Sequence, residues 1–151
     1  MKRLVGILGC LLGACATAPR TTQEVRDGVK GGAAFTRWEE RQVHRPFSIV
    51  LNDVRSNADR CLNQDARLGG AGPYGSWGVV HFSSSTSQTS ARTGEMVVQG
   101  RGAYLLLADV EAAAPKETRV TVYGPSASGY KDLFDAVFQW AQGKAQECPT
   151  L

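Results

Sequence analysis

Two glycine-containing segments have spacings that occur in sites that bind phosphate or activate a serine. Residues 70–75 read GxGxxG. This motif binds phosphate when a strand precedes it and a helix follows it, whereas here a predicted helix precedes it and a predicted strand follows it. Residues 124–129 do lie between a predicted strand and a predicted helix. However, Ser128 stands where a GxSxG motif needs glycine, and Tyr130 stands where a P-loop needs lysine. We interpret residues 124–129 as a turn in which Ser128 caps the following helix, although an anion could bind at the N-terminus of that helix.

The histidines and carboxylates form no recognisable catalytic pattern. No spacing selects His44 or His81, with any serine, for a Ser-His-Asp triad. Glu39 and Glu40 are neighbours on a predicted strand, so their side chains point to opposite faces and cannot act on one bond. The chain has no CxxC motif, and its histidines are far from Cys61 and Cys148 in sequence. We therefore expect no enzyme activity, no metal and no cofactor.

Hydrophobic periodicity predicts the elements that would position these residues. Apolar residues recur at the 3.6-residue period of an amphipathic helix from Phe47 to Leu62 and again from Tyr130 to Cys148. Pro46 suits the start of the first helix, and Pro149 ends the second. Strands are predicted over residues 35–44, 77–84, 95–99, 103–112 and 118–123, with a loop over 63–76 and a polar hairpin tip or mobile loop over 83–90.

The order β-α-β-β-β-β-α predicts an α+β fold. We expect a two-layer sandwich in which both helices cover one face of an antiparallel sheet of about 4–5 strands. This order is similar to that of helix-grip domains, such as those in lipoproteins of the outer-membrane barrel assembly machinery. Because no sequence motif of that family is present, the resemblance implies a fold and no function.

One strand predicts a candidate partner surface. Tyr104, Leu106, Ala108 and Val110 alternate along it and should face the helices. The opposite face would then carry an apolar cluster open to a partner, formed by Leu105, Leu107, Val79 and Val97. The alternative is that strand coiling, or the chain segment that precedes the domain, covers these residues.

The N-terminus has the pattern of an export signal. Lys2 and Arg3 precede a short apolar stretch that ends in small residues, and the stretch is too short for a spanning helix. Leu12-Gly13-Ala14-Cys15 resembles the lipobox of bacterial lipoproteins. The resemblance implies cleavage before Cys15, a diacylglycerol on its sulfur and acylation of its new amine. Residues 1–14 would then be the signal peptide, residues 15–33 a lipidated tether and residues 34–151 one periplasmic domain.

Two other ways of processing this segment remain open. Residues 7–10 form a second, poorer lipobox that ends at Cys10, and ordinary cleavage near Cys15 would leave a free thiol. Ala16 follows the preferred cysteine, and a residue other than aspartate there implies sorting to the outer membrane. The chain has 17 Lys+Arg and 14 Asp+Glu, but Lys2 and Arg3 would leave with the signal, so 15 and 14 remain and nucleic acid is not an expected partner.

The lipobox resemblance also accounts for the four cysteines. Cleavage removes Cys10 and lipidation uses Cys15, which leaves Cys61 and Cys148 in an oxidising compartment. We predict that they form a disulfide which joins the C-terminal ends of the two helices; the alternative is two unrelated buried thiols.

These patterns together predict a lipid-anchored envelope protein. The 151 residues suffice for one globular domain, and a content of 21% charged residues excludes a disordered chain. We expect a non-catalytic, outer-membrane-anchored domain that faces the periplasm and binds an envelope protein or another envelope component. The alternative is a small-ligand-binding or hydrolytic domain that uses a cleft between helices and sheet.

Overall fold

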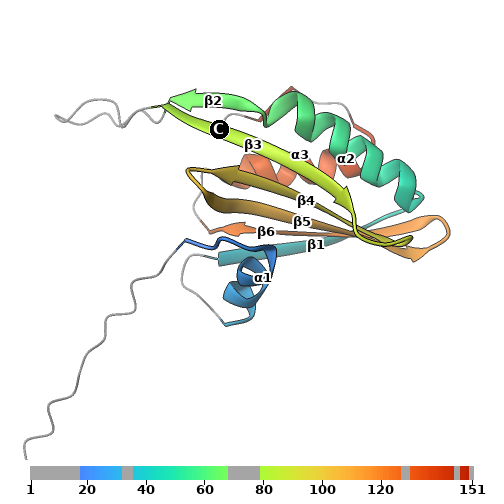
Figure 1. The fold of residues 1–151 in the computed structure, drawn as a ribbon. Coiled ribbons are helices and arrows are strands. Elements are labelled where there is room, and N and C mark those ends of the chain that lie inside the picture. Colours follow the sequence, from blue (N-terminus) through green and yellow to red (C-terminus); the bar gives the residue numbers. More distant parts are fainter. Residues whose placement is uncertain (1–17, 32–35, 68–78, 127–129, 145–146, 150–151) are drawn as a thin grey trace, which may run out of the picture.

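The computed structural model describes residues 18–31, 36–67, 79–126, 130–144 and 147–149. These residues form an α+β fold with one six-stranded antiparallel sheet and three helices (Figure 1). The strands lie in the order β1-β6-β5-β4-β3-β2, so β1 returns to pair with β6 while the other strands pair with their sequence neighbours. The elements are α1 (Thr22–Lys30), β1 (Thr36–Val43), α2 (Phe47–Cys61), β2 (Gln64–Arg67), β3 (Val79–Gln88), β4 (Thr93–Gly100), β5 (Ala103–Ala114), β6 (Glu117–Pro125) and α3 (Lys131–Ala141).

The main core lies between the sheet and the helices α2 and α3 (Figure 1). The predicted stripe of α2 is confirmed, because Val50, Val54 and Ala58 are fully buried. From α3, Trp140 and Phe138 are also fully buried. The α+β class and the packing of these two helices against an antiparallel sheet are as predicted. Six strands replace the expected four or five, and among the described residues no helix is long and apolar enough to cross a membrane.

The third helix, α1, lies on the opposite face of the sheet, in the segment that we expected to be a tether (Figure 1). The Glu24 backbone N–H donates to Thr21 Oγ1 (3.1 Å), and the Arg20 N–H donates to Glu24 Oε2 (2.6 Å). These bonds satisfy N–H groups that have no partner inside the helix. The prediction of a tether over residues 15–33 is therefore wrong for residues 22–30.

The sheet extends into two segments that were expected to be loops. β3 continues to Gln88, so most of the polar tract 83–90 is strand, and the turn is confined to the residues before Thr93. The serines are poor strand formers, but each pairs with a residue of β4, for example Ser84 with Val98. β2 falls within the expected loop 63–76 and pairs with the first residues of β3. In both places, pairing with a neighbouring strand outweighs weak local propensity.

The last helix is shorter than its apolar period predicts. α3 ends at Ala141 rather than Cys148, because Gly143 adopts a left-handed conformation with φ of 77°. The Gly143 N–H donates to Trp140 O (2.9 Å), and the Lys144 N–H donates to Gln139 O (3.0 Å). This pair of bonds is the Schellman motif, which satisfies carbonyl groups at a helix end.

The disulfide does not join two helix ends. Arg45, which precedes α2, donates from Nη1 to Ala141 O (2.8 Å), so α2 begins where α3 ends and the helices run antiparallel. Cys61 ends α2, and its sulfur is at bonding distance from that of Cys148, with a Cα–Cα separation of 5.1 Å. The pairing of Cys61 with Cys148 is as predicted. Its position differs, because the bond attaches the chain that follows α3 to the end of α2.

Two glycines with positive φ give a matched test of the α3 end. A Cβ atom on Gly143 would lie 2.7 Å from Arg45 Nη1, whereas a Cβ atom on Gly102 (φ 74°) would meet nothing within 4 Å. We expect Gly102→Ala to cost about 1–2 kcal/mol for the left-handed backbone alone. Gly143→Ala should cost more, because it also displaces Arg45 from Ala141 O and from Asp53 Oδ2. Thermal denaturation of the two variants checks this, and equal melting temperatures would contradict it.

Candidate functional site on the second face of the sheet

A β-bulge in β5 decides which side chains reach the second face, which is the face opposite α2 and α3. Leu106 pairs with Val98 and Tyr104 pairs with Gln99, so Leu105 is an extra residue on β5. An extra residue reverses the alternation of side chains beyond it. Leu105 therefore packs against the main core, and Tyr104 lies on the second face. The predicted faces of these two residues are exchanged, whereas Leu106 is on the helix side as predicted.

The expected apolar surface is covered by α1. Val25 of α1 (5% exposed) packs with Val97 (6%) and Leu107 (0%), and Tyr104 and Tyr123 lie at the border of this cluster. The prediction of an open partner surface is thus wrong for Leu107 and Val97, as it is for Leu105. The alternative, cover by the preceding chain segment, is what the structure has. Val79 begins β3, but its side chain lies outside the described residues.

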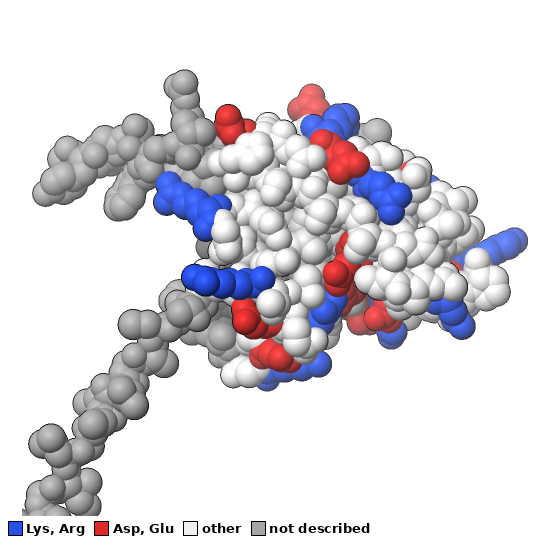
Figure 2. Space-filling view, in the orientation of Figure 1, with Lys and Arg blue, Asp and Glu red and all other residues white. Residues whose placement is uncertain are grey.

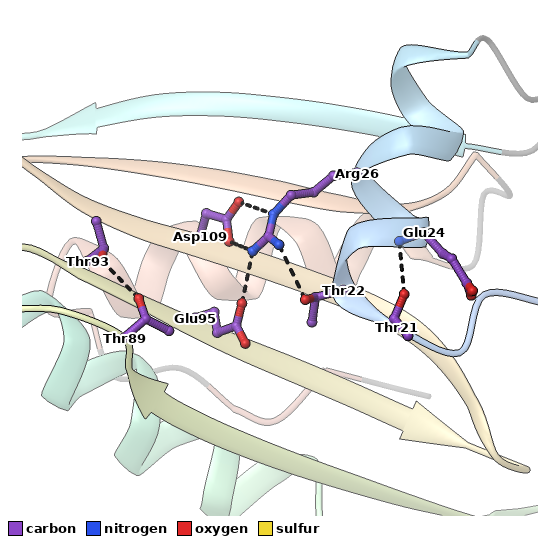
Figure 3. A network of polar contacts seen from close by, with 8 residues as sticks. All are labelled: Thr21, Thr22, Glu24, Arg26, Thr89, Thr93, Glu95 and Asp109. Carbon is purple, nitrogen blue, oxygen red and sulfur yellow. Dashed lines mark hydrogen bonds and ion pairs between the residues drawn. The ribbon is translucent and has the colours of Figure 1, made fainter.

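An arginine of α1 fixes the helix on the sheet beside this cluster (Figure 3). Arg26 donates from Nε to Asp109 Oδ2 (2.9 Å) and from Nη2 to Asp109 Oδ1 (2.6 Å), in a bidentate pair. Its Nη2 also donates to Glu95 Oε2 (2.9 Å), and its Nη1 donates to Thr22 Oγ1 (3.3 Å). The hydrogen bonds to Asp109 raise the pKa of Arg26 further above its usual value, so the guanidinium stays charged.

The side chains of this network are largely buried. Those of Arg26 and Glu95 are 23% exposed and that of Asp109 is 15% exposed. Burial, together with the negative charge of Asp109, also raises the pKa of the neighbouring Tyr123 hydroxyl. The network orients α1, and its two carboxylates come from paired residues of neighbouring strands, Glu95 of β4 and Asp109 of β5.

The part of the second face that α1 leaves open is polar. Ser83, Ser85 and Ser87 alternate on β3 with residues that face the helices, and Ser85 pairs with Val97. Figure 2 shows an area with few charges over β3 and β4, between the charged side chains of α1 and those of α2. Trp38 of β1, opposite Tyr123, is 54% exposed on this face. These side chains can offer hydroxyl groups and one aromatic ring to a partner.

The predicted catalytic candidates do not come together. His81 Nδ1 is 2.8 Å from Asp65 Oδ1 across β2 and β3, but both side chains are about two thirds exposed, at 68% and 66%. In the described ranges, no serine is hydrogen-bonded to this pair. His44 is 85% exposed beside Glu117. Residues 70–75 and Ser128 lie outside the described residues, and the described ones contain no group of three or more His, Cys, Asp or Glu that could hold a metal.

Glu39 and Glu40 point to opposite faces, as predicted. Glu39 forms ion pairs with Arg37 and Arg41, whose guanidinium groups lie over aromatic rings of α3. Glu40 instead accepts a bond from Thr121 Oγ1 (3.4 Å). Aromatic and aliphatic side chains fill the space between the described helices and the sheet, so this region gives no support to a ligand cleft there.

Sequence patterns do not identify Val25 and Arg26, because residues 16–33 are small and polar and show no apolar period over their whole length. The signal that could have revealed α1 is the spacing Thr21-x-x-Glu24, which is typical of a helix start. Val25 and Val29, four residues apart, supply the start of an apolar face. Cys15, the predicted lipid site, lies outside the described residues.

These features define a small α+β domain. Its sheet packs against α2 and α3 on one face and against the short helix α1, which Arg26 holds in place, on the other. No protein-family model and no curated protein matches the chain. Among solved structures, it is similar to one entitled "Crystal structure of Ara h 8.0201". The TM-score is 0.40 at 14% sequence identity, over 72% of this chain and 95% of that one. A similarity of this size assigns neither a family nor a function.

Proposed function

We propose that this chain is a lipid-anchored protein of the bacterial cell envelope that binds another envelope component and is not an enzyme. The observation that carries the proposal is Leu12-Gly13-Ala14-Cys15, which resembles a lipobox and follows a cationic and then apolar export signal. Two or three acyl chains on Cys15 would hold the protein on the membrane without a protein helix. Ala16 favours the outer membrane, with the domain on the periplasmic side.

The cysteine pair supports export. A bond between Cys61 and Cys148 closes a long loop, with a sequence separation of 87. Disulfides persist in the periplasm and are rare in the reducing cytoplasm. A secreted domain of this size gains stability from such a cross-link.

The binding role rests on the second face. The Arg26 network keeps α1 on its apolar part, so the open part is the hydroxyl-rich area of Ser83, Ser85 and Ser87, with Trp38 beyond α1. The exposed ring of Trp38 favours a protein partner, because aromatic side chains are enriched at protein–protein interfaces. We place the partner on this area.

Anchoring is tested by fractionation of cells that produce the natural chain or Cys15→Ser. We expect the natural chain in the outer-membrane fraction, with a mass that fits cleavage before Cys15 and acylation. The Cys15→Ser chain should lose the acyl mass and leave that fraction. Cys10→Ser is the matched control and should behave like the natural chain. An unmodified Cys15, or lipid on Cys10, would contradict the proposal.

Binding is tested in the same cells with a photo-crosslinking residue at Ser85. We expect crosslinks to a defined envelope component from Ser85 and none from the exposed Ser56 on α2, which serves as the control. Equal capture from both positions, or from neither, would contradict a partner on the second face.

A further inference from the structure

We propose that the end of the sheet which carries the β4–β5 turn (residues 100–103) faces the lipid surface, and that Arg20 and Arg101 contact anionic headgroups there. This inference rests on the proposed lipidation of Cys15. It concerns the orientation of the domain, which the anchor alone does not determine. The argument combines the length of chain after Cys15, the place where that chain meets the sheet, and the side chains at that place.

The chain becomes attached to the sheet only four residues after Cys15. The Tyr104 backbone N–H donates to Pro19 O (2.8 Å), and α1 then packs on the second face through Val25 and Arg26. Four extended residues span at most about 14 Å. The lipid therefore holds Pro19, and with it the start of β5, close to the membrane surface.

The two ends of the sheet differ in their distance from this attachment point. β5 runs from Ala103 to Ala114, and its residues 103 and 113 are separated by roughly 33 Å at the rise of a β-strand. Residues 100–103 and the end of β6 at Pro125 lie at the near end, because β5 pairs antiparallel with both of its neighbours. The β5–β6 turn (residues 114–117) lies at the far end. A flexible tether over the full segment 15–33 would let either end of the sheet reach the membrane. The difference between the two ends therefore depends on the docking of α1 and of the residues before it.

The exposed side chains at the near end suit a phospholipid surface. Arg20 and Arg101 are both exposed there, and Arg101 is in the turn itself with φ of 52°. Figure 2 shows basic side chains at this end of the molecule, beside the N-terminal segment. Guanidinium groups form bidentate bonds with phosphate.

The test uses the full-length, lipidated protein in phosphatidylcholine vesicles that carry a headgroup-attached quencher. One fluorophore is placed at Ala103→Cys and, in a second protein, at Ala113→Cys, so the same substitution probes both ends of one strand. We expect quenching at position 103 to exceed that at position 113 by about twofold or more, given the roughly 33 Å between them. Equal quenching, or stronger quenching at position 113, would overturn the orientation.

Two further measurements separate the parts of the inference. Addition of phosphatidylglycerol should increase quenching at position 103, and Arg101→Gln should reduce that increase; no response to the anionic lipid would overturn the arginine contact. Intact mass reports the acyl chains on Cys15 in the same samples. An acylated Cys15 without any end preference would contradict the orientation alone, whereas an unacylated Cys15 would contradict the proposed function and this inference with it.

Discussion

Reduction of the bond between Cys61 and Cys148 is expected to lower the free energy of unfolding by roughly 4–5 kcal/mol. The bond links residues with a sequence separation of 87, and chain entropy predicts a large effect for a loop of that length. Typical domains have a total stability of about 5–15 kcal/mol, so the loss should lower the melting temperature markedly. The bond also attaches the chain that follows α3 to the C-terminal end of α2.

Chemical and thermal denaturation with and without a reductant measure this effect. The double variant Cys61→Ser/Cys148→Ser should match the reduced protein and show no response to the reductant. Cys15→Ser, which keeps the pair, should respond like the natural domain. An unchanged unfolding midpoint on reduction would show that the pair contributes nothing to stability and would contradict the prediction.

Val25→Asp is expected to release α1 from the second face. Val25 is 5% exposed between Val97 and Leu107, and burial of a valine side chain contributes about 1.5–3 kcal/mol, which the substitution would lose. The new carboxylate would also be buried without a partner and would lie close to Asp109 and Glu95, which already share Arg26. A nine-residue helix is not stable in isolation, so α1 should unfold once it is released.

Hydrogen exchange at the Tyr104 amide reports this release, because that amide donates to Pro19 O only while the segment is docked. We expect faster exchange there, with unchanged protection in α2. Gln23→Asp is the control, since it adds the same charge on the exposed side of α1. Slow exchange at Tyr104 in the Val25→Asp protein would contradict the assigned role of Val25. In the vesicle experiment, the same variant should lose its end preference, because the free chain from Cys15 to β1 would then span up to about 70 Å.

The second face of the sheet differs from the predicted partner surface in two respects, the β-bulge at Leu105 and the cover by α1. Period-two alternation in β5 correctly predicted Leu106, Ala108 and Val110 on the helix side, and it correctly predicted that Leu107 is on the other. It could not predict that Leu105 bulges, because a bulge depends on the register between β4 and β5. Nor could it predict which surface remains open. The cover comes from α1, which the buried Val25 and the ion pairs of Arg26 with two separate strands hold there.

In the helices, too, the sequence predicts one part of the structure and tertiary contacts decide the other. The apolar stripe of α2, which begins at Phe47 and has a period of 3.6 residues, is as predicted, because every residue of the stripe belongs to the core. The stripe of α3 continues in the sequence beyond Ala141, yet the helix stops there, since Gly143 adopts a left-handed backbone conformation and closes a Schellman motif. Periodicity is a local signal of which residues could be helical, and it does not include the turn that ends the helix.

The sequence by itself determined the α+β class, the amphipathic character of α2, the pairing of Cys61 with Cys148 and the expectation of a lipid on Cys15. Each of these depends on residue types and spacings along the chain. The tertiary structure alone decided the sixth strand, the bulge at Leu105, the antiparallel course of α2 and α3, and the docking of α1 over Leu107. These features depend on contacts between residues far apart in the chain, such as Arg26 with Asp109, and the free energy of such contacts exceeds the weak local preferences from which the predictions were made.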